Sequence, residues 1–128
     1  MRPGTWRLLL IPLISAGLLA GCTGGVTRPT YTSSIGGYPA NGKQLIRERH
    51  CGSCHTIPGI HGADGVFGPP LTSFGDRTYI AGNFPNVPKN LVHWIMAPQI
   101  MKPKTAMPDL GLSEQQARDV AAYLYTLR

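Results

Sequence analysis

The sequence predicts a small all-α fold, with three to five helices joined by long loops. Near the C-terminus, apolar residues recur at the three- and four-residue spacing that is typical of one face of a helix. Two prolines, Pro88 and Pro98, stand where proline starts or stops a helix. The sequence lacks the alternating apolar and β-branched runs that indicate strands.

The first 21 residues are predicted to be an export signal. Arg2 and Arg7 form a positive start, and the apolar stretch 8–20 is too short to span a bilayer. The stretch ends at Leu19-Ala20-Gly21-Cys22, which resembles a bacterial lipoprotein signal. In that family the chain is cleaved before the cysteine, whose thiol is then lipidated. The alternative is an ordinary signal peptide in which Cys22 is incidental.

This signal sets the expected location and charge. We expect a protein that is exported and lipid-anchored to a bacterial membrane, facing the periplasm or the outer surface. Loss of residues 1–21 removes two arginines and lowers the net charge from +6 to about +4. A mildly basic chain fits an acidic protein partner. A nucleic-acid role is not expected, because no basic cluster with interleaved aromatic residues is present.

The rest of the chain divides into a linker and one domain. Residues 22–38 are rich in Gly, Thr and Ser, so they are predicted to form a flexible tether with a reach of about 20–25 Å. Residues 39–128 are predicted to form a single folded domain.

Three helices are predicted with defined ends, and a fourth is suggested. The first runs from Ala40 or Asn41 to Arg49, and its inward residues are Leu45 and Ile46. Residues 72–81 are expected to include a short helix. The next runs over about 88–97, with proline at its first position and a stop at Pro98.

The last helix carries the clearest signals. Ser113, followed three residues later by Gln116, forms a capping box, and Glu114 suits the positive end of the helix dipole. The predicted helix covers residues 114–127. Its apolar stripe consists of Ala117, Val120, Ala121, Leu124 and Leu127.

One motif identifies a cofactor. Cys51-Gly52-Ser53-Cys54-His55 has the C-x-x-C-H form in which two thiols bind haem vinyl groups and the histidine becomes an axial ligand of the iron. A redox dithiol is the first alternative, but no strand–helix–strand pattern surrounds the pair. A zinc site with His50, His55 or His61 is the second, but a further pair of spaced ligands is missing from the sequence.

Spacing leaves two candidates for the second axial ligand. Met107 lies in a loop just before the capped helix, and Pro108 stiffens the backbone after it. Met101, in the same loop region, is its main rival. Met96 is predicted to be core and His93 to be solvated. His50 and His61 are expected at the surface.

From about Asn41 to Leu127 the chain resembles a class I cytochrome c. It is particularly similar to the cytochrome c domain of subunit II of caa3-type haem–copper oxidases. Beside the C-x-x-C-H motif and its Thr56, the matching segments are Gly68-Pro69-Pro70-Leu71-Thr72, Pro88-Lys89-Asn90-Leu91, Trp94-Ile95, Ala97-Pro98-Gln99, Lys102-Pro103, Met107-Pro108-Asp109-Leu110-Gly111-Leu112-Ser113 and Ala121-Ala122-Tyr123-Leu124.

The resemblance implies one covalent haem c wrapped by the loops, with Met107 as its distal ligand. It also implies that the Pro69 carbonyl accepts the second N–H of His55, which fixes the ring. Gly42 is expected to let the first and last helices cross closely, beside Ile46 and Tyr123. Three side chains are candidates for bonding the haem propionates: Arg77, Tyr79 and Trp94.

The expected function is one-electron transfer, without catalysis by the chain itself. A His/Met-ligated haem carries single electrons. The expected partners are redox proteins of a respiratory chain, namely a terminal haem–copper oxidase or an upstream dehydrogenase or bc-type complex. The sequence shows neither a copper-binding domain nor a transmembrane hairpin, so lipid at Cys22 is the expected anchor. Candidates for a basic docking rim are Lys43, Arg47, Arg49, Lys102 and Lys104.

Two other functions stay open. One is a haem enzyme or gas-binding sensor in which Met107 leaves a five-coordinate iron. The other is a fixed electron-entry subunit of an oxidase or dehydrogenase complex.

Overall fold

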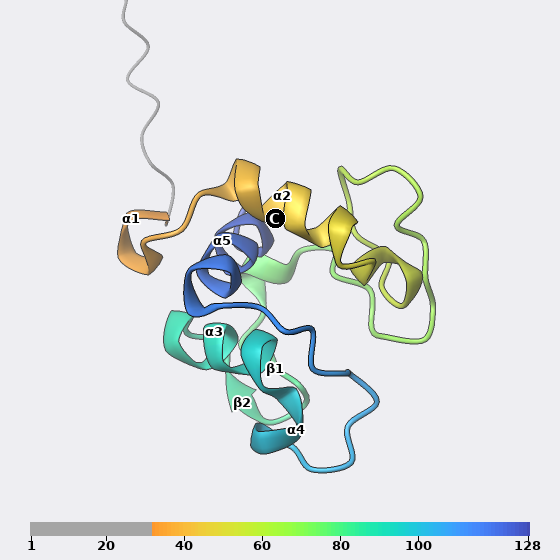
Figure 1. Cartoon of the computed structure of the whole chain (residues 1–128), viewed down its shortest axis with the longest axis vertical. Coiled ribbons are helices and arrows are strands. Elements are labelled where there is room, and N and C mark those ends of the chain that lie inside the picture. The colour runs from red at the N-terminus through yellow and green to blue at the C-terminus, as the bar shows by residue number, and fades with distance from the viewer. Residues whose placement is uncertain (1–31) are drawn as a thin grey trace, which may run out of the picture.

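The computed structural model describes residues 32–128 (Figure 1). The predicted signal, Cys22 and the first part of the predicted tether lie outside the described residues. The described part is mainly helical, as predicted. In chain order its elements are α1 (Thr32–Ile35), α2 (Pro39–Glu48), the 3-10 turn η1 (Cys51–Ser53), the 3-10 turn η2 (Phe74–Asp76), β1 (Tyr79–Ile80), β2 (Phe84–Pro85), α3 (Pro88–Met96), α4 (Pro98–Met101) and α5 (Glu114–Leu124).

The centre of the fold is the crossing of α2 over α5, which Figure 1 shows. Gly42 lies at the contact, and a Cβ atom added there would sit 2.0 Å from the carbonyl oxygen of Asp119. The predicted close crossing is therefore confirmed, because only a residue without a side chain allows this approach. Leu45 and Ile46 are buried, as predicted, although α2 begins at Pro39 and ends at Glu48.

Helix α5 begins as predicted. The Ser113 side chain accepts the Gln116 backbone N–H, and the Gln116 side chain accepts the Ser113 N–H, so the capping box is complete. The helix ends at Leu124, three residues before the predicted end, and the chain continues as a turn. Four of the five residues of the predicted stripe are buried: Ala117, Val120, Ala121 and Leu124.

The helix expected within residues 72–81 is wrong. This region holds only the turn η2 and the first strand of a small antiparallel hairpin, β1–β2. Ala81 and Gly82 have positive φ angles of 49° and 94°, so they reverse the chain instead of continuing a helix. The expectation of no strands is also wrong, since β1 and β2 form this hairpin. Strands of two residues are too short to show an alternating pattern in the sequence.

Helix α3 covers Pro88–Met96, close to its predicted range, and Pro88 opens it as expected. Pro98 does end this helix, but it also starts the short helix α4, which the sequence did not indicate. Leu91 and Ile95 are buried, Trp94 is half-buried against Phe84, and His93 is exposed. Helix α3 packs against α5 and so completes the core.

The described end of the predicted tether is folded. Ile35 is 1% exposed, and its carbonyl accepts a 2.8 Å hydrogen bond from Arg118 of α5. The backbone N–H of Tyr38 donates to the carboxylate of Asp119, which is itself buried. We call residues 32–38 the strap, because they bind along α5. A flexible tether is therefore excluded for this part, since buried apolar and hydrogen-bonded groups hold it.

Within residues 32–128, the structure contains no helix that is both long and apolar enough to cross a membrane.

Candidate haem-binding site

The two motif cysteines lie on the turn η1 and the residue that follows it. Both are free thiols, Cys51 half-buried and Cys54 exposed. In a 3-10 turn, residues three apart lie on the same side, so the thiols share one face. Burial raises the pKa of the Cys51 thiol, and Cys54 adds to the rise, while a backbone hydrogen bond opposes it.

The imidazole of His55 is held by the chain. Its Nδ1 lies 2.8 Å from the carbonyl oxygen of Pro69. A carbonyl can only accept, so Nδ1 carries the proton and Nε2 keeps its lone pair. This is the hydrogen bond that the resemblance implied, and it leaves one ring nitrogen available to a metal.

Glycines bring the following loop against this turn. A Cβ atom added at Gly68 would lie 2.3 Å from Cε1 of His55, and one added at Gly65 would lie 2.5 Å from the backbone of Ser53. Backbone hydrogen bonds join the same parts, from Gly68 N–H to the Cys54 carbonyl at 2.7 Å and from Gly65 N–H to the Gly52 carbonyl at 3.0 Å. The loop therefore forms a tight cradle around the histidine.

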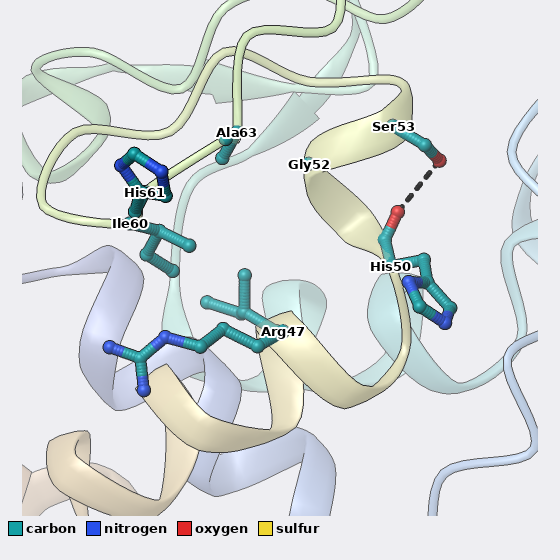
Figure 2. A pocket seen from close by; sticks show the side chains of 9 residues that line it. Arg47, His50, Gly52, Ser53, Ile60, His61 and Ala63 are labelled. Atoms are coloured by element: carbon teal, nitrogen blue, oxygen red, sulfur yellow. Dashed lines mark hydrogen bonds between the residues drawn. The ribbon is translucent and has the colours of Figure 1, made fainter.

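A hollow of about 330 Å³ lies behind the turn (Figure 2). Its lining includes Gly52 and Ser53 but neither cysteine, so it lies on the face of η1 away from the thiols. Arg47 of α2 and His61 of the following loop also line it. His50 and His61 are exposed, as predicted.

The methionines occupy different settings. Met107 is half-buried in the loop between α4 and α5. Met101 is the last residue of α4 and is also half-buried. Met96 packs against the core, as predicted. The geometry of residues 32–128 does not decide between Met107 and Met101, so the choice of distal ligand stays a prediction.

Two polar side chains around Met107 were missed by the sequence reasoning. Gln99 of α4 donates to the carbonyl oxygens of Thr105 at 2.6 Å and Met107 at 3.1 Å. Arg49, at the end of α2, donates to the carbonyl oxygen of Leu110 at 3.1 Å. The sequence analysis named Gln99 only within a family-like segment and Arg49 only as a docking candidate, because both side chains bind backbone carbonyls, which carry no sequence signal.

The candidates for the propionates have other contacts. Arg77 donates to the carbonyl oxygens of Pro70 and Thr72 and stacks 5.4 Å from the Phe74 ring centre, so it supports the loop after the motif. Trp94 packs near Phe84, with ring centres 6.4 Å apart. Tyr79 is 57% exposed. These contacts favour structural roles for Arg77 and Trp94.

Some residues of the candidate docking rim also make hydrogen bonds within the protein, whereas others are exposed. Arg49 holds Leu110, and Lys102 donates to the Ala81 carbonyl at 2.9 Å. Arg47 and Lys104 are exposed, while Lys43 is half-buried.

The residues present fit a covalent haem. The cradle supplies an imidazole with one fixed nitrogen, and two thiols lie on one face beside it. Apolar side chains packed on the core but only partly covered provide surface for a large planar group: Leu71, Phe84, Trp94, Met96 and Leu110. Among residues 32–128, no three His, Cys, Asp or Glu side chains are grouped as a metal site.

Comparison with known proteins agrees with this chemistry. A family model described as Cytochrome c matches residues 39–128. Cytochrome c oxidase subunit 2 of Alkalihalophilus pseudofirmus is 35% identical over 109 residues, which are 84% of this chain and 30% of that protein. The protein of the same name from Bacillus subtilis is 34% identical over 82 residues, or 59% and 23% of the two chains. The matched parts thus span less than a third of either relative. The chain belongs to the cytochrome c family, whose members carry iron in a covalently bound haem c and transfer electrons.

Proposed function

We propose that this chain is a membrane-tethered, one-electron carrier of a respiratory chain. Cys51 and Cys54 would hold the haem through thioether bonds, and His55 and Met107 would ligate its iron. When bound, the haem supplies the one-electron couple. The protein residues fix its position, fill both axial positions and keep other ligands away, so the chain itself catalyses no bond chemistry.

The observation that carries this proposal is the hydrogen bond from His55 Nδ1 to the Pro69 carbonyl. It fixes the tautomer that leaves Nε2 unprotonated, and a fixed ring keeps its orientation when the iron changes charge. The Gly68 backbone packed against the same ring supports this role, because it restricts rotation.

The test of the ligands is a pair of matched variants. Met107→Ala should abolish the sulfur-to-iron charge-transfer band of the ferric holoprotein, while Met101→Ala should retain it. A lower reduction potential should accompany the loss, because thioether ligation raises the potential. The reverse result would assign the distal position to Met101. A high-spin wild-type protein that binds carbon monoxide readily would favour the haem enzyme or gas sensor instead.

The location is the second part of the proposal. Cys22 carries lipid after removal of residues 1–21, and the haem domain faces the periplasm or the outer surface. The sequence Leu19-Ala20-Gly21-Cys22 supports it, because lipidation uses the one thiol that haem attachment leaves over. Mass analysis of the N-terminal peptide from membranes tests this. A peptide that retains residues 1–21, or an unmodified Cys22, would contradict it.

The proposed partner is a terminal haem–copper oxidase with an acidic docking surface. Support comes from the net positive charge of the chain, +6, and from the exposed rim candidates Arg47 and Lys104. Electrostatic docking of this kind is fast and weakens with salt. Oxidation by membranes that contain such an oxidase should therefore slow as the salt concentration rises.

A fixed subunit of an oxidase is the second candidate. Both relatives are named cytochrome c oxidase subunit 2, and the similar segment is only part of each. This favours a cytochrome that stays with an oxidase. Co-purification with oxidase subunits through a detergent and high-salt wash would support the fixed subunit, whereas release would support the carrier.

A further inference from the structure

We propose that Gln99 is a positioning residue for the distal ligand. Its side-chain amide fixes the backbone on both sides of Ala106 and thereby holds Met107 in place for the iron. The inference rests on the proposed ligation by Met107.

The geometry sets Gln99 apart from its neighbours. Its Nε2 carries two hydrogens, and it lies 2.6 Å from the Thr105 carbonyl oxygen and 3.1 Å from that of Met107. One planar amide therefore bridges two carbonyls that are two residues apart. The backbone between them is drawn into a turn around a single donor, and the start of the Met107 side chain is fixed with it.

The loop has few other restraints at this point. From Ala106 to Gly111, every hydrogen bond that the structure shows within residues 32–128 uses a side chain. Besides the bond from Gln99, Met107 makes one further hydrogen bond within residues 32–128, from its N–H to the Thr105 hydroxyl at 3.5 Å. Helix α4 supplies the rigid end, because the N–H of Lys102 bonds the carbonyl of Pro98 at 2.8 Å. Within the described part of the chain, the Met107 loop has no backbone–backbone hydrogen bonds of its own at this point, so Gln99 fixes its position relative to helix α4.

The test replaces the amide donor of Gln99 with a side chain of the same shape that cannot donate. Gln99→Glu removes both N–H groups and turns a carboxylate toward two carbonyls, whereas Gln99→Lys keeps donors on a long side chain. In the ferric holoprotein, Gln99→Glu should let added imidazole displace Met107 with an affinity about tenfold higher, because a pair of hydrogen bonds is lost. Gln99→Lys should restore most of the wild-type affinity.

A matched control separates positioning from general stability. Asn90 of α3 also uses a side-chain amide, which donates to the Pro85 carbonyl at 3.0 Å. Asn90→Asp makes the same chemical change away from the Met107 loop, and should leave the imidazole affinity unchanged. Hydrogen exchange gives a second readout: the Met107 amide should exchange faster in Gln99→Glu and not in Asn90→Asp.

The outcomes distinguish this inference from the proposed function. If Met107→Ala leaves the charge-transfer band intact, the ligation itself is wrong. If that band depends on Met107 but Gln99→Glu has wild-type imidazole affinity and amide exchange, the ligation stands and the role of Gln99 is overturned. An equal rise in affinity in Asn90→Asp would also overturn it, because the effect would then be general.

Discussion

The two sides of the site are built by different means. The attachment segment, residues 51–71, is held by backbone hydrogen bonds such as Leu71 N–H to the Thr56 carbonyl at 2.8 Å, and by glycines that let the chain approach itself closely. The distal segment, residues 98–112, is held after Thr105 by side chains, chiefly Gln99 and Arg49.

This difference sets what substitution can do. Closely packed backbone atoms cannot move aside for an added side chain. A substitution at such a contact in the attachment segment should therefore disrupt the site, and one away from these contacts should have little effect. Side-chain hydrogen bonds can be removed one at a time, so single substitutions in the distal segment should each weaken the ligation by a small amount. A protein whose haem ligation is tuned by evolution would be expected to vary mainly on the distal side.

Gly68→Ala should have the largest effect. The new Cβ would lie 2.3 Å from a ring carbon of His55, and the bond to the Pro69 carbonyl prevents that ring from turning away. Overpacking of this kind costs about 2–3 kcal/mol in the free energy of unfolding. Guanidinium unfolding of the holoprotein measures it. Val66→Ala is the control, because Val66 is 85% exposed and should change stability by less than about 0.5 kcal/mol. Equal midpoints for the two variants would refute the rigid attachment segment.

Tyr123→Phe should have an intermediate effect that depends on pH. The Tyr123 hydroxyl donates to the Pro58 carbonyl at 2.8 Å, so its loss should cost about 1 kcal/mol at neutral pH. Burial raises the pKa of Tyr123 above its ordinary value of 10.0, although the charge of Arg47 lowers it.

The sign of the pH effect follows from that rise. As the pH increases, the unfolded chain loses the tyrosine proton before the folded protein does. The contribution of Tyr123 is therefore complete below about pH 10 and declines as the pH rises through the folded pKa. The difference in stability between wild type and Tyr123→Phe should shrink from pH 8 to about pH 11. Val66→Ala, at a residue that is 85% exposed and carries no titratable group, should show no such trend. A constant difference for Tyr123→Phe would contradict the expected linkage.

Lys104→Gly should have the smallest effect and the opposite sign. Lys104 has a φ of 69°, in the left-handed region that disfavours side chains. Glycine removes this strain but makes the unfolded chain more flexible, so the net gain is about 0.5–1 kcal/mol. Lys104→Ala is the matched control, since it removes the charge and keeps the strain. Thermal unfolding that shows equal gains in both variants would attribute the effect to charge.

The sequence predicted the parts of the molecule that depend on local pattern. The capping box at Ser113, the apolar stripe of α5 and the buried residues of α2 were all read correctly, because spacing along one helix determines them. The close crossing at Gly42 and the contact of Pro69 with His55 followed from the resemblance.

The remaining features depend on contacts that no spacing pattern in the sequence indicates. The hairpin β1–β2 is stabilised by Asn86, whose side chain donates to the carbonyls of Phe74 and Arg77, and its strands are too short to carry a pattern. Gln99 and Arg49 act on loop carbonyls, which every residue has. The folded strap was missed because its composition is that of a linker, while the groups that bind it belong to α5.

The strap determines where the N-terminus of a truncated version for expression should lie. The family match begins at residue 39, and a chain trimmed to that point would lose Ile35 from the core and one donor to the buried Asp119 carboxylate. The folded unit therefore extends further toward the N-terminus than the family boundary. With lipid at Cys22, as proposed above, the anchor would lie ten residues before the strap, which begins at Thr32.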